Sequence, residues 1–477
     1  MRKKGSVTVF LTLILSLLLS LICASIESVR MASARTQILN GMDIGLYSLF
    51  GQYDKELLAD YDLFALDGSR GGGQLDLAAV CDELEAYMNP VLKQNSQKLT
   101  LCQSGLTGYR LLTDQKGEAF YQQIVGYMQE TLGSQGIQLL LGRMSERQEK
   151  TAQADQSANQ AQSKGSIDRY DSEMNQASEK SQQAAEEAQV VPQAPPAKNP
   201  ITIMKRIMKR GVLELVLPGG NGLSTKEIEK GTLVSGRGLQ QGMEMPDGMT
   251  VENSYTSEVL FQQYLMEHLG SYAEPSSAGL AYQMEYVFGG KNSDEDNLKA
   301  VASKLLFIRE GVNFACLMAD NVKRSEAQAL ATAIASGFLV PPAAVIIEAA
   351  LILCWAFAES VLDVRELFAG GRIPLVKSSG DWQISLGNLP DLMEGLDSMR
   401  RNDEKGMSYK DYLQVLVLTV SKEKKAMRAM DMIENTIREK GRKNFCMDSC
   451  IVALEAFADV KANKKKEFQV IRQSCYE

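Results

Sequence analysis

A run of twenty uncharged residues near the start of the chain constrains its structure more than any other feature. The run, VTVFLTLILSLLLSLICASI, extends from Val7 to Ile26 and consists mainly of Leu, Ile and Val with some Ser and Thr. A helix of roughly 20 apolar residues is long enough to cross the ~30 Å hydrocarbon core of a bilayer. The run therefore predicts a membrane-spanning helix.

The charges on either side of this run predict its orientation. Arg2, Lys3 and Lys4 come before it, and Glu27 and Arg30 follow it. Basic residues that flank a span tend to stay on the cytoplasmic side. We therefore expect a single-pass protein of the cell membrane with a cytoplasmic N-terminus, and the rest of the chain outside the cytoplasm.

A cleaved secretory signal is the alternative interpretation of the same run. The apolar part of such a signal is ~7–15 residues long and ends at a small-x-small cleavage site. This run is longer, and the only candidate site has bulky Ile22 beside Cys23 and Ala24. Leu21 and Ile22 before Cys23 also disfavour a lipoprotein cysteine. A retained span is therefore the prediction.

The composition predicts globular domains and limits the classes of partner. The chain has 477 residues, a net charge of −8 and no long basic run after its first residues, so no nucleic-acid partner is expected. Its eight cysteines show no CxxC pair and no zinc spacing. We predict no metal, no cofactor and free buried thiols, with a bridge between Cys450 and Cys475 as the alternative.

Periodicity and composition divide the chain into four ranges of an α+β protein. Residues 1–52 are the predicted transmembrane helix and an amphipathic stalk, and 53–144 are a small α+β domain. Residues 145–200 are rich in Gln, Ala and Ser, which is typical of a linker or a solvated helix. The range 201–477 is an α-rich α+β domain with a helical hairpin over 325–368 and a C-terminal β-hairpin. The expected head is mostly helical and extracytoplasmic, with short strands.

Local patterns predict the individual elements. Alternation and apolar runs predict strands at Tyr61–Asp67, Lys98–Thr113, Val212–Leu217 and Gly380–Leu386. Helical periodicity predicts helices at Leu75–Met88, Gly117–Leu132, Ser257–Leu269, Leu280–Phe288, Tyr409–Val420 and Glu423–Lys440. Ser224 to Glu227 fits a capping box, and Asn292 or Ser293 can cap the helix that begins near Asp294.

A second apolar region extends from Ala327 to Ala358. Pro341 and Pro342 divide it into two helices, each shorter than a span requires, and Glu348 lies inside the second helix. A buried helical hairpin is the prediction, and contact with the membrane is the alternative.

The sequence offers little support for catalysis. Glu348, Glu359 and Asp363 can share one helix face as a carboxylate pair, but a polar edge or an ion pair with Arg365 is the simpler expectation. The only histidine, His268, lies on an amphipathic helix without an Asp or Cys cluster around it. There is no phosphate-binding loop, dinucleotide fingerprint or HExxH motif. We therefore predict that the protein is not an enzyme.

The beginning of the chain resembles a pilin-like protein. KKGSVTVFLTLIL is similar to the N-terminus of a type IV prepilin or a Tad/Flp minor pseudopilin, in which a peptidase cuts after a Gly. The resemblance implies cleavage between Gly5 and Ser6, although Phe10 stands where such proteins usually carry Glu. The following ASIESVRMASARTQILNGMDIGLYSLF is similar to TadE/TadG-like proteins, in which the helix continues beyond the span as a stalk.

The region from Leu280 onwards resembles an uncharacterised bacterial family, a domain of unknown function. The resemblance is carried by AYQMEYVFGGKNSDEDNLKAVASKLLFIREGVNF, AFAESVLDVRELFAGGRIPLVKSSGDW and SYKDYLQVLVLTV. Members of that family have one N-terminal span and are associated with Tad/Flp pilus loci of Gram-positive anaerobes. The resemblance implies no chemistry.

These features predict a membrane-anchored structural protein of the cell envelope. Within that class, the resemblances imply a minor pseudopilin-like component or an assembly factor of a Tad/Flp-type pilus. Its expected partners are the lipid bilayer and either pilins or the Tad secretion machinery. A membrane-anchored extracellular binding or adhesion module without a connection to pili is the alternative. Gly5 favours the first function, and Phe10 favours the second.

Overall fold

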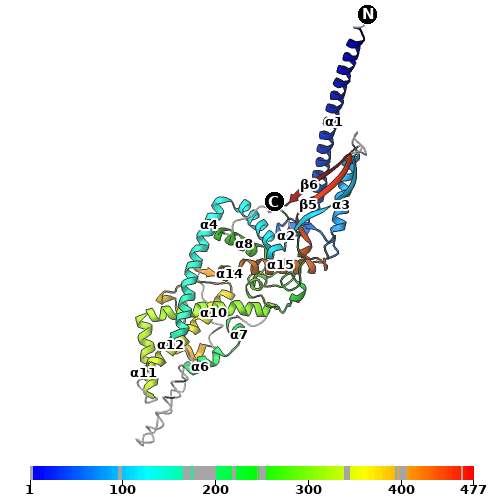
Figure 1. Ribbon diagram of the computed structural model, residues 1–477. Coiled ribbons are helices and arrows are strands. Elements are labelled where there is room, and N and C mark those ends of the chain that lie inside the picture. The colour runs from blue at the N-terminus through cyan, green and yellow to red at the C-terminus, as the bar shows by residue number, and fades with distance from the viewer. Residues whose placement is uncertain are drawn as a thin grey trace. The chain divides into compact units, whose positions relative to one another are not determined.

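The described part of the chain is mostly helical and also contains strands, so the predicted α+β class is confirmed at this level (Figure 1). The structure is a computed structural model that describes residues 4–94, 99–164, 172, 176, 200–217, 222–243, 245, 254–337, 344–392, 396, 406–462 and 466–476. The chain forms two compact units. Unit 1 comprises Met1–Tyr127, Gly231–Glu252 and Ile433–Glu477, and unit 2 comprises Met128–Lys230 and Asn253–Met432.

Unit 1 is built on one antiparallel sheet. Its central strand β5 (Cys450–Ala462) pairs on one side with β2 (Leu99–Leu111) and on the other with β6 (Lys466–Cys475) and the short β1 (Leu66–Asp67). The register places Gly105, Phe457 and Ile471 side by side across the three long strands. A side chain at Gly105 would collide with the ring of Phe457, which lies over this glycine.

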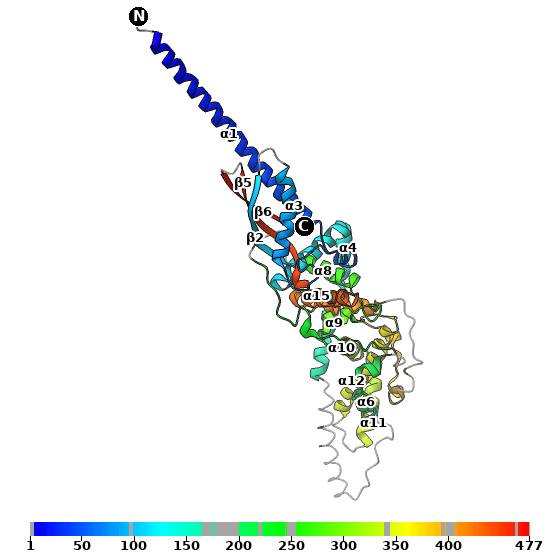
Figure 2. The same ribbon diagram turned by 90° about the vertical axis from the view of Figure 1, so that its right-hand side faces the viewer.

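Two helices cover the inner face of this sheet: α1 (Lys4–Phe50) and α3 (Leu77–Lys93), as Figure 2 shows. Every second residue of β5 points toward them, because side chains alternate between the two faces of a strand. These inward residues are small or branched and fully buried: Leu454, Ala456, Ala458 and Val460. They form one hydrophobic core with the C-terminal half of α1 and with α3.

Short elements complete unit 1. Helix α2 (Lys55–Tyr61) follows α1, and the 3₁₀ turn η5 (Met447–Ser449) leads into β5. Two of the four boundaries between the units fall inside α4 (Asp114–Lys164) and α15 (Lys422–Glu439).

Unit 2 is helical around a central pair of helices, α10 (Asp294–Ala319) and α12 (Ala344–Phe368), with α11 (Asn321–Gly337) packed on α12. The remaining helices are α6 (Pro200–Met208), α7 (Val212–Val216), α8 (Tyr255–His268), α9 (Gln283–Gly289) and α14 (Tyr409–Leu418). The other elements are the strands β3 (Arg372–Ile373) and β4 (Met407–Ser408) and the 3₁₀ turns η3 (Ser379–Asp381) and η4 (Leu386–Asp391). The 3₁₀ turn η1 (Lys230–Thr232) lies at a boundary between the units.

Several local predictions agree with these elements. The strand expected at Lys98–Thr113 is β2, and the side chain of Ser293 caps α10 by accepting from the backbone N–H of Asp296. Residues 145–164 of the predicted linker or solvated helix belong to α4. Most of the rest of that range, and Pro341 and Pro342, lie outside the described residues.

Other local predictions are wrong. Val212–Leu217 is not a strand but the helix α7 and its end, and Gly380–Leu386 contains no strand. A short apolar run fits either element, and its neighbours decide between them. Arg365 on α12 donates to the carbonyls of Leu215 and Leu217, which completes the last turn of α7.

Two further expectations at turns also fail. Only Leu66–Asp67 of the strand expected at Tyr61–Asp67 is extended, because Tyr61 ends α2. Ser224 begins no helix, and its hydroxyl donates instead to Asp294 at 2.5 Å. None of the eight cysteines forms a disulfide, so the alternative bridge between Cys450 and Cys475 is absent.

Candidate functional site

The apolar part of α1 is the most exposed hydrophobic surface of unit 1. Every residue from Val7 to Arg30 is exposed, and large side chains such as Leu17 remain 66% accessible. Burial of apolar surface contributes about 25 cal/mol per Å². A helix with apolar residues on all of its faces is therefore stable only in an apolar surrounding.

The polar groups of this stretch are satisfied within the helix itself. The hydroxyls of Thr12, Ser16 and Ser20 donate to carbonyl oxygens three residues earlier, at 2.9 to 3.1 Å. A segment in hydrocarbon requires this arrangement, because no water is present there to bind a free hydroxyl or carbonyl. The stretch thus has the length, composition and hydrogen bonding of a membrane span.

The same helix changes character beyond Arg30. From Ala34 onwards one face is buried, and Ala34, Ile38 and Met42 repeat every four residues on the core of unit 1. Two glycines permit this packing. A Cβ atom at Gly45 would lie 2.6 Å from the side chain of Met88, and one at Gly41 would lie 3.2 Å from Leu92. A single continuous helix therefore joins the exposed apolar stretch to a packed core.

A second helix, α12, also has the length and hydropathy of a span, but 78% of its apolar window is buried inside the protein. It belongs to the core of unit 2, where it packs against α10 and α11. The predicted burial of this region agrees with that position. By the same test, none of the other described helices is a candidate span.

The carboxylates predicted near α12 form ion pairs rather than a catalytic pair. Asp363 receives two hydrogen bonds from Arg309, at 2.7 and 3.0 Å, and a contact from Lys377 at 2.5 Å. Lys377 also binds Glu359, and all four side chains are buried. Burial acts to raise the pKa of Asp363, but Arg309 and Lys377 outweigh it and lower that pKa to about 2.

The prediction that these carboxylates pair with Arg365 is wrong, because the Arg365 guanidinium donates to the backbone carbonyls of Leu215 and Leu217. Glu348 binds Arg324 at 3.2 Å. His268 stacks on Tyr264, with ring centroids 4.0 Å apart, and its Nδ1 lies 3.0 Å from the Tyr264 carbonyl oxygen. These residues are engaged in structural contacts.

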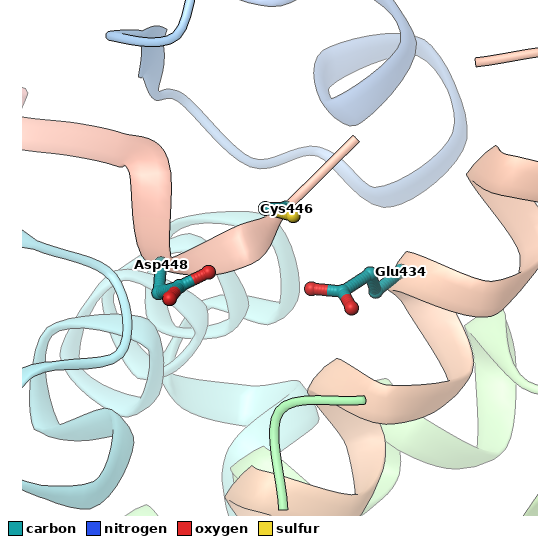
Figure 3. A group of neighbouring side chains, drawn as sticks. All are labelled: Glu434, Cys446 and Asp448. Atoms are coloured by element: carbon teal, nitrogen blue, oxygen red, sulfur yellow. The ribbon is translucent and has the colours of Figure 1, made fainter. Parts of the chain in front are cut away.

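One group has the composition of a metal site: Glu434 from α15, with Cys446 and Asp448 from the segment before β5 (Figure 3). Their ligand atoms lie within 4.8 Å of one another. However, Arg237 binds both carboxylates at 2.5 Å, and Arg438 binds Glu434 at 2.7 Å. Two guanidinium groups already balance the two negative charges.

When no metal is bound, the thiol of this group is protonated. Burial and the nearby Glu434 carboxylate raise the pKa of Cys446. Arg438 donates to its sulfur at 3.3 Å. Asp448 accepts from the backbone N–H of Gln240 at 3.0 Å, so the group holds the 231–243 segment against α15 and η5.

Glu285 on α9 is a buried carboxyl without a basic partner among the described residues. Its Oε1 accepts from the Tyr409 hydroxyl at 2.6 Å and from the Tyr272 backbone N–H at 2.8 Å. Its Oε2 has no hydrogen-bond partner among the described residues. Burial raises the pKa of Glu285 to about 7.

A family model with the description "Family of unknown function (DUF5702)" matches residues 192–462, which is more than half of the chain. The chain belongs to this family. The expectation of an uncharacterised family is therefore confirmed. No curated protein and no solved structure matches the chain.

The DUF5702 segment contains both charged networks and Glu285, whereas α1 lies outside the matched residues. The comparisons do not support the predicted resemblance to TadE/TadG-like proteins. Gly5 and Ser6 lie in the first turns of α1, which begins at Lys4, and Arg2 and Lys3 lie outside the described residues.

Sequence reasoning missed the charged networks of the DUF5702 segment. The available signal was a charge within an apolar stretch: Arg309 in LLFIRE on α10, and Glu434 on the buried face of α15. Charged residues are almost never fully buried unless they are paired. The sequence indicates that partners exist, but it does not identify them.

Proposed function

We propose that this protein is a membrane-anchored structural component of the cell envelope. The observation that carries the proposal is the two-part character of α1, in which an exposed apolar stretch from Val7 onwards continues into a helix packed on a folded core. Lys4 precedes the stretch, which favours a cytoplasmic N-terminus and an extracytoplasmic head.

Within that class, we propose a minor pseudopilin-like component or an assembly factor of a Tad/Flp-type pilus. A pilin-like subunit needs an apolar helix that packs either in lipid or against similar helices, and a head fixed rigidly to it. The packing of α1 and α3 on an antiparallel sheet is consistent with that requirement. Gly5 immediately before the apolar stretch supports processing at Ser6.

The buried ion pair of Asp363 favours a structural role for this residue. Asp363 is bound by Arg309 and Lys377, which lower its pKa to about 2. A carboxylate with so low a pKa does not exchange protons near neutral pH.

Topology is tested by adding an external protease to intact protoplasts. We expect digestion of the head and a small protected membrane fragment that contains Val7–Ile26. Protection of the C-terminal region would contradict the orientation. N-terminal sequencing of the native protein then distinguishes a start at Ser6 from an intact leader or from cleavage near Ala24.

The pilus role needs a separate test in a strain that lacks the gene. We expect fewer or shorter pili in that strain, and substoichiometric copurification of the protein with pilus machinery. Normal piliation without copurification would favour a membrane-anchored binding or adhesion module, the function that Phe10 in place of Glu supports.

A further inference from the structure

Three basic side chains of unit 1 lie near the point where the apolar stretch of α1 ends. Arg30 is on α1, Lys461 is near the end of β5, and Lys466 begins β6; all three are exposed. In the sequence Lys466 is the last of three consecutive lysines. The protein as a whole is acidic, with a net charge of −8, so a basic cluster is a local departure from its average surface.

Strand β6 runs alongside α1 in the same direction, which fixes the level of Lys466 (Figures 1 and 2). The Tyr476 hydroxyl donates to the carbonyl of Phe50 at 2.7 Å, and Arg472 binds Asp43 at 3.0 Å. Lys466 precedes Arg472 by six residues, or ~20 Å of strand. On α1 the same distance corresponds to ~13 residues, which leads from Asp43 back to Arg30. Lys466 therefore lies at about the level of Arg30.

Lys461 lies at this level as well. In the antiparallel register it pairs with Glu467, next to Lys466, and the two side chains form an exposed ion pair. Acidic groups of the described residues near this level include Glu467, which is bound to Lys461, Asp459, which lies two residues before Lys461 on β5, and Glu27, which lies about one turn before Arg30. Exposed ion pairs are weak and exchange readily for other partners.

The headgroup layer of a bilayer extends ~5–7 Å beyond the hydrocarbon core on each side. A span that ends at Ile26 places the next four or five residues of the helix in this layer. Arg30, Lys461 and Lys466 then meet the phosphates of the lipids. We propose that these three residues bind anionic lipid headgroups and seat unit 1 on the membrane surface, an inference that rests on the proposed membrane anchor.

The experiment uses the full chain in vesicles of neutral phosphatidylcholine, and in vesicles that also contain anionic phosphatidylglycerol. Flotation reports insertion of the anchor, and hydrogen exchange of peptides covering 456–475 reports contact of the β5 and β6 ends with lipid. A basic residue at an anionic surface contributes about 1 kcal/mol, or about fivefold in an equilibrium constant. We expect exchange in these peptides to be at least about fivefold slower in the anionic vesicles, and we expect high salt to abolish the difference.

The variant Lys461→Glu/Lys466→Glu should lose this protection and still float with the vesicles. Lys466→Gln alone, which leaves the Lys461–Glu467 pair intact, should lose part of it. The matched control Lys55→Glu/Lys443→Glu changes two exposed lysines beside the other end of α1 and should behave as the parent protein. Equal exchange in both lipids, with normal flotation, would overturn this inference and leave the anchor standing. Failure of the parent chain to float would overturn the anchor itself.

Discussion

Replacing Arg309 with Met should strongly destabilise unit 2. The guanidinium is fully buried, and it donates to Asp363 and to the carbonyl oxygens of Pro374 and Leu375 at 2.7 to 3.0 Å. Methionine fills a similar volume but donates no hydrogen bond. The change leaves two carbonyls without this donor and leaves two buried carboxylates, Asp363 and Glu359, to share Lys377.

The loss of one partner from a buried ion pair sets the size of this effect. Arg309 and Lys377 together lower the pKa of Asp363 from 3.8 to about 2 in the folded protein, so the charged form of Asp363 contributes to stability. Because the pKa is lowered, this stability is present above pH 4 and is lost as the pH falls through 2. Breaking a buried ion pair by removing one partner typically costs about 3–5 kcal/mol. We therefore expect a loss of about 3 kcal/mol or more at pH 7.

Thermal unfolding of the full chain in detergent, followed by circular dichroism, measures the effect. A loss of 3 kcal/mol lowers the melting temperature by about 6 °C or more in a domain of this size. The matched control is Arg206→Met, which makes the same change at an exposed position on α6. In the double variant Arg309→Met/Asp363→Asn, Glu359 and Lys377 are again balanced, so part of the loss should be recovered. Equal melting temperatures for the Arg309 and Arg206 variants would refute the reasoning.

Three other changes test the remaining features of the two units. Because burial raises the pKa of Glu285 to about 7, this carboxyl holds its proton more tightly in the folded protein than in the unfolded chain. Its contribution to stability is therefore greatest below pH 4.5 and falls as the pH rises toward 7. The variant Glu285→Gln should flatten this fall, as measured by urea unfolding between about pH 5 and 8. A steeper fall in that variant would contradict the assignment. Met42→Ala should lower the unfolding free energy of unit 1 by about 2–5 kcal/mol in urea titrations, since the side chain is fully buried, and a change below 1 kcal/mol would show that the α1 packing is loose. Gly45→Val should cost about 1–3 kcal/mol by collision with Met88, and the additional change Met88→Ala should relieve part of that strain; thermal unfolding of the single and double variants measures both effects.

Local sequence was sufficient for the α10 cap and for strand β2, whose physical causes lie among neighbouring residues. The cap at Ser293 depends on a hydroxyl and an N–H three residues apart. The strand β2 was predictable because its composition and boundaries are local. The partner of β2 was not predictable, because β5 lies more than three hundred residues away in the sequence.

The elements that sequence reasoning assigned wrongly are those whose conformation depends on distant groups. VLELVL from Val212 to Leu217 fits a strand or a helix equally well, and its helix is completed by Arg365. The backbone around Gln383 and Ile384 was expected in a strand, but its N–H groups donate to the buried Glu359 carboxylate. In both cases a charged side chain from α12 takes the hydrogen-bonding place of a neighbouring strand.

The sequence by itself determined the apolar stretch of α1, because hydropathy and length are local properties and a bilayer responds to them directly. It also determined most helix positions, through periodicity and capping. Only the tertiary structure decided that the last strands of the chain pack on α1, with Arg472 bound to Asp43, and that Arg309 and Asp363 form a buried pair. Those contacts join residues far apart in the chain, and a buried charge is stable only where a particular distant partner reaches it.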